Sequence, residues 1–198
     1  YDHGEKLKCF INSIKSQTFD DWFLHIVHDG KCTKFEQLKQ TLEEDGYLSN
    51  KRVKLSATEH RYNDWGHSLR AWALKNPISN SRYTILTNGD NYYVPEWLRF
   101  LNEAAQEKQY PDIMYWDCVH NHVGNPNFDR MDSYGLLNSE FKNGACDMGC
   151  VAIKSEVARQ VGFTSKAFEA DWIYFNECQQ FIEHPQIEKI PKILFVHN

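Results

Sequence analysis

One stretch of the chain constrains its fold more than any other: an apolar run ends in a polar turn, and a helix begins soon after it. Residues 83–86 are aromatic, β-branched or aliphatic, which predicts a buried strand. Residues 88–91 have the sequence Asn-Gly-Asp-Asn, which favours a turn, and Pro95 suits the first position of a helix. The stretch therefore predicts that Asp90 lies at the carboxyl end of a strand, the edge at which open α/β sheets bind their ligands.

The predicted turn offers oxygen ligands to a cation. The carboxylate of Asp90 is flanked by the amides of Asn88 and Asn91, and such hard oxygen atoms suit a hard divalent cation. A plain surface turn has the same composition, so this stretch alone leaves both interpretations open.

Predicted strands alternate with predicted helices along the rest of the chain. The apolar residues of segment 7–14 recur at helical spacing, which predicts a helix with one buried face. Alternation of this kind indicates a single α/β domain with a mostly parallel central sheet flanked by helices. The other predicted strands cover residues 24–27, 53–55, 113–116, 150–153 and 190–196, and further helices are predicted after residues 66, 95, 154 and 168.

Several predicted strands end in polar residues. Asp29 follows the strand 24–27, and Asp117 and His120 follow the strand 113–116. Because the carboxyl ends of parallel strands meet at one edge of a sheet, we expect these side chains to gather there. Asp117, His120 and Asp147 could touch a bound ligand at that edge, although a purely structural role is the simpler interpretation for each.

Composition limits the class of protein. A chain of 198 residues that is 41% hydrophobic can bury one substantial core. Its net charge of −5 and its lack of a basic run argue against a nucleic-acid surface. We find no stretch of about 18 apolar residues that could span a membrane. The six cysteines are scattered along the chain, which favours reduced thiols in a cytoplasmic protein.

Two further features concern the surroundings of the predicted site. Segment 121–137 contains glycine and proline but few apolar residues, which predicts a long loop over the site. Three aromatic residues could stack on the rings of a bound ligand, but we favour the interpretation that they belong to the core. These residues are Trp65, Tyr92 and Tyr134.

Five segments carry paired polar, glycine and aromatic residues at the ends of predicted elements. They are Tyr1-Asp2 with residues 13–18, residues 27–30, Asn63 with Gly66 and Arg70, residues 87–91 with Pro95 and Leu98, and Gly162-Phe163 with residues 169–172. In this order, and over nearly the whole chain, they resemble the motifs of the GT-A glycosyltransferases, in particular the family 2 type. The resemblance implies the Rossmann-like GT-A fold and one catalytic domain over residues 1–198.

The resemblance also implies an activity. Such an enzyme moves a sugar from a nucleotide-diphosphate donor, here expected to be UDP-linked, to an acceptor hydroxyl with inversion of the anomeric carbon. The acceptor would be a glycan, a lipid or a protein, and the cofactor would be Mn²⁺ or Mg²⁺.

Residue roles follow from the matched positions. Asp171 matches the catalytic base, with Glu169 as a substitute, because Ala170 stands where the family has an acid. Asp90 matches the direct metal ligand, and His197, after the last predicted strand, matches a histidine that adds a further ligand. The expected nucleotide-binding residues are Tyr1, Asp2, Asp29, Asn63, Arg70, Asn88 and Gly89.

The chain also departs from the family pattern. His28 and Asn88 stand where the family has aspartates. In the family a first strand and a Pro-x-Tyr-Asn turn lead into the position of Tyr1, so we expect an apolar strand before this residue.

Three alternatives to the inverting transferase remain. A retaining GT-A transferase uses the same metal turn, so Asp90 does not decide the stereochemistry. A sugar-nucleotide pyrophosphorylase has a related fold, but Gly4 alone does not supply the glycine-rich stretch near its start. A non-catalytic module that binds sugars or nucleotides is consistent with the replaced acids.

Overall fold

The computed structural model describes residues 4–121 and 134–198 of the chain. Tyr1 and Asp2, and most of the predicted loop 121–137, lie outside the described residues. The helices are α1 (Gly4–Lys15), α2 (Thr33–Glu44), α3 (His67–Lys75), α4 (Trp97–Glu107), α5 (Ser155–Val161) and α6 (Ala170–Phe181), with one short 3-10 turn, η1 (Met148–Cys150). The strands are β1 (Leu24–His28), β2 (Val53–Ala57), β3 (Tyr83–Thr84), β4 (Tyr92–Tyr93), β5 (Ile113–His120), β6 (Gly135–Leu137), β7 (Val151–Lys154) and β8 (Ile187–Val196).

The strands form two sheets, and the larger sheet is mixed. Strands β1 and β2 pair in parallel, and a separate six-stranded sheet has the order β3-β7-β5-β8-β4, with β6 paired to β5. Only β5 and β8 run parallel in the larger sheet, so the prediction of a mostly parallel sheet is wrong. The reason is connectivity. Parallel neighbours need a crossover of a dozen or more residues, usually helical, and the described residues between β5 and β7 contain β6 and η1 but no such helix.

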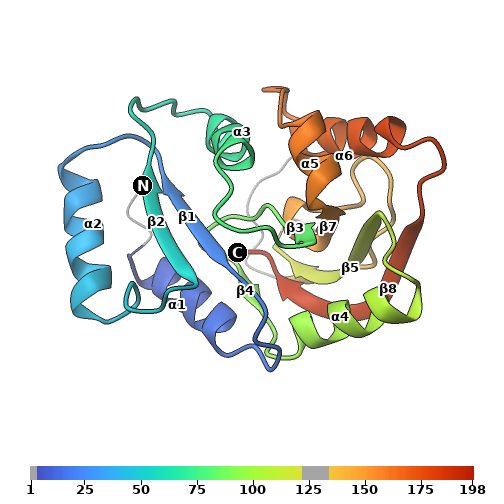
Figure 1. The fold of residues 1–198 in the computed structure, drawn as a ribbon, viewed down its shortest axis with the longest axis horizontal. Helices are drawn as coiled ribbons and strands as arrows, with labels where there is room; N and C mark the ends of the chain where they lie inside the picture. The colour runs from blue at the N-terminus through green and yellow to red at the C-terminus, as the bar shows by residue number, and fades with distance from the viewer. Residues whose placement is uncertain (1–3, 122–133) are drawn as a thin grey trace.

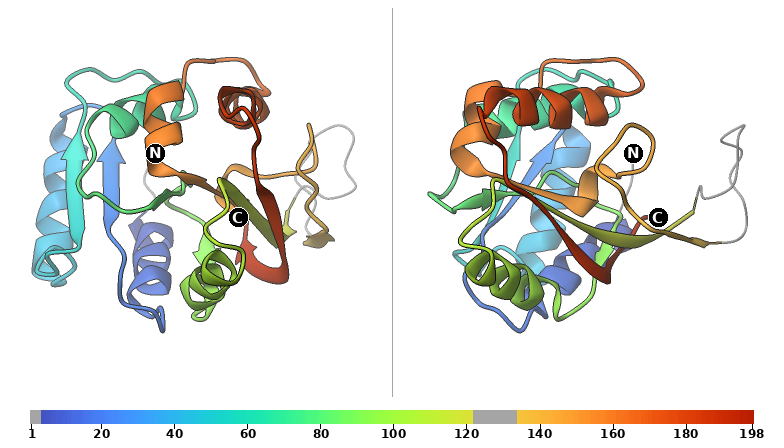
Figure 2. Two further views of the ribbon diagram at one scale, coloured as in Figure 1. Left: turned by 45° about the vertical axis from the view of Figure 1, so that its right-hand side comes forward. Right: turned by 90° about the vertical axis from the view of Figure 1, so that its right-hand side faces the viewer.

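Strand β5 divides the core into two apolar layers. Its side chains alternate between the faces of the sheet, so Met114 and Trp116 pack with residues of α1 and α4, whereas Ile113 packs with residues of α5 and α6. The ribbon views agree: α4 lies on one side of the large sheet, and α5 and α6 lie on the other (Figures 1 and 2). The β1–β2 pair, with α1 and α2, forms the other half of the molecule (Figure 1).

The structure corrects several predicted boundaries. The strand expected over residues 83–86 covers only Tyr83–Thr84, because its partner β7 pairs with these two residues alone. The turn that contains Asp90 therefore precedes β4 directly, rather than following a long strand. Asp117 and His120 lie within β5 and not after it, since this strand is longer than the apolar run that predicted it. The helix expected to begin at Pro95 begins at Trp97.

A buried glutamine joins α1 to the start of α4. The Gln17 Nε2 group donates to the main-chain oxygens of Ser13 and Val94, each at 2.8 Å. Its Oε1 atom accepts from the main-chain N–H of Leu98 at 3.0 Å, in the first turn of α4. Helix N-termini leave main-chain N–H groups without helical partners, so this side chain caps α4 from a distance.

We expect Gln17→Leu to lower the free energy of unfolding by about 1–3 kcal/mol, because the buried Leu98 N–H loses its partner. Urea denaturation measures the change. The matched control is Gln40→Leu, since Gln40 is exposed and bonds only to Glu44 on its own helix. Equal effects of the two substitutions would contradict the capping role.

Candidate functional site

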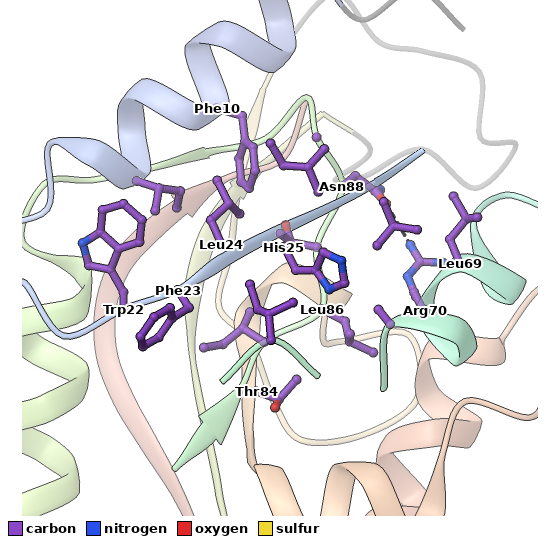
Figure 3. Close-up of a pocket in the computed structure, with 18 of the residues that line it drawn as sticks. Phe10, Trp22, Phe23, Leu24, His25, Leu69, Arg70, Thr84, Leu86 and Asn88 are labelled. Carbon is purple, nitrogen blue, oxygen red and sulfur yellow. Dashed lines mark hydrogen bonds between the residues drawn. The ribbon is translucent and has the colours of Figure 1, made fainter. Parts of the chain in front are cut away.

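A cavity of about 1280 Å³ is lined by residues of α1, β1, α3 and segment 81–90. Figure 3 shows that apolar side chains, among them Trp22 and Leu24, line one end, whereas Arg70 and Asn88 lie at the other. The polar end coincides with the turn that the sequence analysis selected. The nucleotide-binding residues expected on α3 and on the turn are therefore close together.

Arg70 connects three segments at this polar end. Its Nη2 group donates to Asn88 Oδ1 at 2.8 Å, and its Nη1 group donates to the main-chain oxygen of Trp65 at 3.1 Å. The guanidinium also lies over the ring of Phe163, with 5.6 Å between the guanidinium carbon and the ring centroid. Gly66, the residue before α3, has a φ of 85°, a conformation that suits glycine. These contacts hold a permanent positive charge beside the turn.

Asp29 organises the loop before α3. Its two carboxylate oxygens accept from the main-chain N–H groups of Tyr62 at 2.7 Å and Asn63 at 2.8 Å. This loop-anchoring role was not anticipated from the sequence, which assigned Asp29 and Asn63 only to nucleotide binding. Asn63 itself has a φ of 52°, in the left-handed region.

The two candidate bases differ in their surroundings. Asp171 lies in the first turn of α6 and is partly buried, whereas Glu169 precedes the helix and is exposed. Burial raises the pKa of the Asp171 carboxyl to about 6, although the positive charge of Arg70 acts in the opposite direction. A carboxyl group with such a pKa can exchange a proton near neutral pH.

A second polar cluster joins the end of β5, the residue before η1 and the residue after β8. The carboxylate of Asp147 and the imidazoles of His120 and His197 bring three potential ligand atoms within 4.8 Å of one another. The Nε2 atoms of His120 and His197 lie 3.5 Å and 3.7 Å from Asp147 Oδ2. The two rings stack, with 4.1 Å between centroids and an interplanar angle of 5°. We call these residues the His-Asp-His cluster.

Neighbouring groups orient this cluster. Asp147 Oδ1 accepts from the main-chain N–H of Gly149 at 2.8 Å. His197 Nδ1 lies 2.8 Å from Asn121 Oδ1, an acceptor for a proton on Nδ1, and His197 Nε2 faces Asp147. Burial alone would raise the pKa of Asp147, but the His120 ring, the charge of His197 and the Gly149 N–H hold it below its ordinary value.

Strand register brings the predicted metal ligands to one edge. Strand β4 pairs antiparallel with β8, with Tyr92 opposite Val196, so the 88–91 turn runs beside His197 and Asn198. The main-chain oxygen of Asp90 accepts from the side-chain amide of Asn198 at 3.3 Å. The carboxylate of Asp90 is not among the atoms of the His-Asp-His cluster.

The sequence analysis did not recognise His120 and Asp147 as possible ligands. It placed both near the expected edge, but they lie 27 positions apart and no local spacing joins them. The missing signal is the register between β5 and β8, in which Val119 pairs with Val196 and the following residues become neighbours.

Comparison with known proteins identifies the fold. No family model matches the chain, and no curated protein matches its sequence. The crystal structure of TarS from S. aureus is similar with a TM-score of 0.72 and 16% identity, over 100% of this chain and 35% of TarS. HddC from Yersinia pseudotuberculosis is similar with a TM-score of 0.55 and 13% identity, over 96% of this chain and 77% of HddC. The chain thus spans about a third of the length of TarS.

The length and the apolar character of the helices bear on whether any of them could span a membrane. Among residues 4–121 and 134–198, no helix has both the length and the apolar character needed to cross a bilayer.

The raised pKa of Asp171 leads to a prediction about stability. Its pKa rises from 3.8 in the unfolded chain to about 6 in the folded protein, so folding is disfavoured wherever the unfolded carboxyl is ionised. This cost is absent below about pH 4 and complete above about pH 6. We therefore expect Asp171→Asn to raise the free energy of unfolding by about 1–3 kcal/mol at pH 7.5 and to have little effect at pH 4.

Urea denaturation of parent and variant at the two pH values measures this difference. Glu169→Gln is the matched control, because Glu169 is exposed, and it should change stability little at either pH. A pH-independent effect of Asp171→Asn would contradict the assignment.

Proposed function

We propose that the chain is the catalytic domain of a metal-dependent glycosyltransferase, which transfers a sugar from a UDP-linked donor to an acceptor hydroxyl with inversion. The observation that carries the proposal is the position of Asp171. Its carboxyl group has a pKa of about 6 and interacts electrostatically with Arg70, which itself bonds to Asn88 of the polar turn. A proton acceptor and a fixed cation thus share one edge, as transfer from a diphosphate requires.

The fold supports this class of enzyme. The similar structures include a glycosyltransferase, TarS, and nucleotide-sugar enzymes. Fold alone does not name a reaction, so the polar groups of the site carry the rest of the argument.

The proposed reaction assigns separate roles to Asp171 and Arg70. Asp171 accepts the proton of the acceptor hydroxyl while the oxygen of that hydroxyl bonds to the anomeric carbon. The bond between that carbon and the diphosphate oxygen breaks on the opposite face of the sugar, which inverts the configuration. Arg70 faces the charge that develops on the leaving diphosphate, and it remains ionised at any working pH. Glu169, exposed before α6, would replace Asp171 only if the helix start rearranged.

The side chains at this edge fit a divalent cation. Asp90 offers a carboxylate, and the His-Asp-His cluster offers two imidazoles and a second carboxylate. The Nε2 atoms of His120 and His197 lie 3.5 Å and 3.7 Å from Asp147 Oδ2, so the three residues could hold one ion. Oxygen ligands suit both Mg²⁺ and Mn²⁺. Such an ion supplies charge neutralisation for a diphosphate.

The residues that would hold such an ion come from neighbouring segments. They would be His197, whose ring Asn121 orients, and Asp147 and His120 of the cluster, with Asp90 offered by the adjacent turn.

The proposed function is tested by turnover. The protein is incubated with a panel of UDP-sugars and simple glycan acceptors in Mn²⁺, and UDP release and the anomeric configuration of the product are measured. Release of UDP with an inverted product is expected, and a retained configuration would refute the inverting mechanism. Formation of a nucleotide-sugar from nucleoside triphosphate and sugar 1-phosphate would identify a pyrophosphorylase instead. Binding of UDP without any turnover would identify a non-catalytic module.

We expect Asp90→Ala and His197→Gln each to remove most of the Mn²⁺-dependent increase in UDP affinity, with little effect on the fold. Calorimetric titration of UDP with and without Mn²⁺ measures the increase. Glu183→Ala and His184→Gln are matched controls at exposed positions just after the C-terminus of α6. The same Mn²⁺ enhancement in Asp90→Ala as in the parent would exclude Asp90 as a ligand.

We also expect Asp171→Asn to lower kcat by about 10²-fold or more, with UDP affinity nearly unchanged, because the carboxylate acts on the acceptor proton in the transition state. The parent rate should rise with pH through an apparent pKa of about 6, in line with the pKa of this carboxyl. If Glu169→Gln shows the large loss and Asp171→Asn does not, the base is Glu169.

A further inference from the structure

Trp65 is presented to solvent in a strained conformation. The side chain of Trp65 is 79% exposed, more than any other described large hydrophobic side chain. Its φ is 53°, in the left-handed region that bulky residues rarely adopt. Tyr92 and Tyr134 are also exposed, so the interpretation of these three residues as core aromatics is wrong. Backbone strain of this kind concentrates at functional sites.

Hydrogen bonds on both sides of Trp65, rather than burial of its side chain, hold this conformation. The Asp29 carboxylate accepts from the N–H groups of Tyr62 and Asn63 before Trp65, and the Trp65 carbonyl accepts from Arg70. Between these anchors, the Asp64 carboxylate accepts from the N–H and hydroxyl of Ser68. The loop is thus fixed on both sides of Trp65, while the indole ring contributes little burial.

The surroundings of the indole indicate the chemistry of a ligand. An exposed indole offers a flat π surface on which another flat ring can stack. The carbonyl of the same residue lies 3.1 Å from Arg70 Nη1, and this arginine also bonds to Asn88 of the polar turn. Trp65, Arg70 and Asn88 all line the cavity. A ligand that meets a flat aromatic surface beside a fixed cation carries a planar ring and an anionic group.

We infer that Trp65 stacks on the base of the nucleotide donor and so sets much of its affinity. This inference rests on the proposed function, which assigns Arg70 to the diphosphate. A sugar acceptor also stacks on tryptophan, but it carries no anion for Arg70. The strained backbone is maintained because it holds the indole clear of the fold, beside the charge that binds the phosphates.

The test uses UDP and pyrophosphate as probes, with calorimetry and tryptophan fluorescence as readouts. We expect UDP, but not pyrophosphate, to quench the emission of the parent protein, and we expect Trp65→Phe to lose this quenching. Stacking on one base is worth about 10-fold in affinity. Trp65→Ala should therefore weaken UDP binding by about 10-fold and leave pyrophosphate binding unchanged.

Two controls separate ligand binding from a structural role. Tyr62→Ala removes another exposed aromatic side chain of the same loop, and it should leave UDP affinity and quenching unchanged. Trp65→Asn should leave the melting temperature of the free protein unchanged, because asparagine tolerates a positive φ and the indole is 79% exposed, while it weakens UDP binding. A melting temperature lowered by several degrees would show that the indole stabilises the fold and would overturn the inference.

The remaining outcomes distinguish this inference from the proposed function. If UDP binds the parent and Trp65→Ala equally, the inference is wrong and the proposed function stands. If Trp65→Ala changes only the KM for the acceptor, the indole binds the acceptor and the inference is again wrong. If the parent binds neither UDP nor pyrophosphate in the presence of Mn²⁺, the proposed function itself fails.

Discussion

The pairing of β8 with both β5 and β4 is the constraint on which the rest of the polar edge depends. In one direction β8 runs parallel to β5, and the main-chain N–H of His197 continues the ladder to the oxygen of Val119 at 2.9 Å. In the other direction β8 pairs antiparallel with β4, which brings the 88–91 turn alongside the same end of β8. Residues far apart in the sequence therefore meet without any local motif.

Two carboxylates of this edge have pKa values shifted in opposite directions, because their neighbours differ. Asp147 lies between two imidazoles and a main-chain N–H, which keep its pKa below the ordinary value despite burial. Burial of Asp171 outweighs the attraction of Arg70 and raises the pKa of this carboxyl to about 6. One carboxylate is thus suited to remain charged beside a cation, and the other is suited to exchange a proton.

Much of the fold was accessible from the sequence, and the reasons for the failures are physical. The helix of segment 7–14 and the long strands were predicted because the spacing of their apolar residues follows directly from which face each element buries. The direction of β7 and the short length of β3 depend on connectivity and on a partner strand, which local pattern does not contain. The site shows the same division. Family resemblance assigned Arg70 and Asn88 to nucleotide binding but not the hydrogen bond between them, whereas the His-Asp-His cluster arises from register and the strained Trp65 from polar anchors elsewhere in the chain.

The central claim is that one edge binds a nucleoside diphosphate and a divalent cation together. Its most direct test is a crystal structure of the protein grown with UDP and Mn²⁺, with anomalous scattering used to locate the ion. The account predicts an ion ligated by His197 and by the diphosphate, with the diphosphate also contacting Arg70. An ion bound away from this edge, or UDP bound at another surface, would contradict the account.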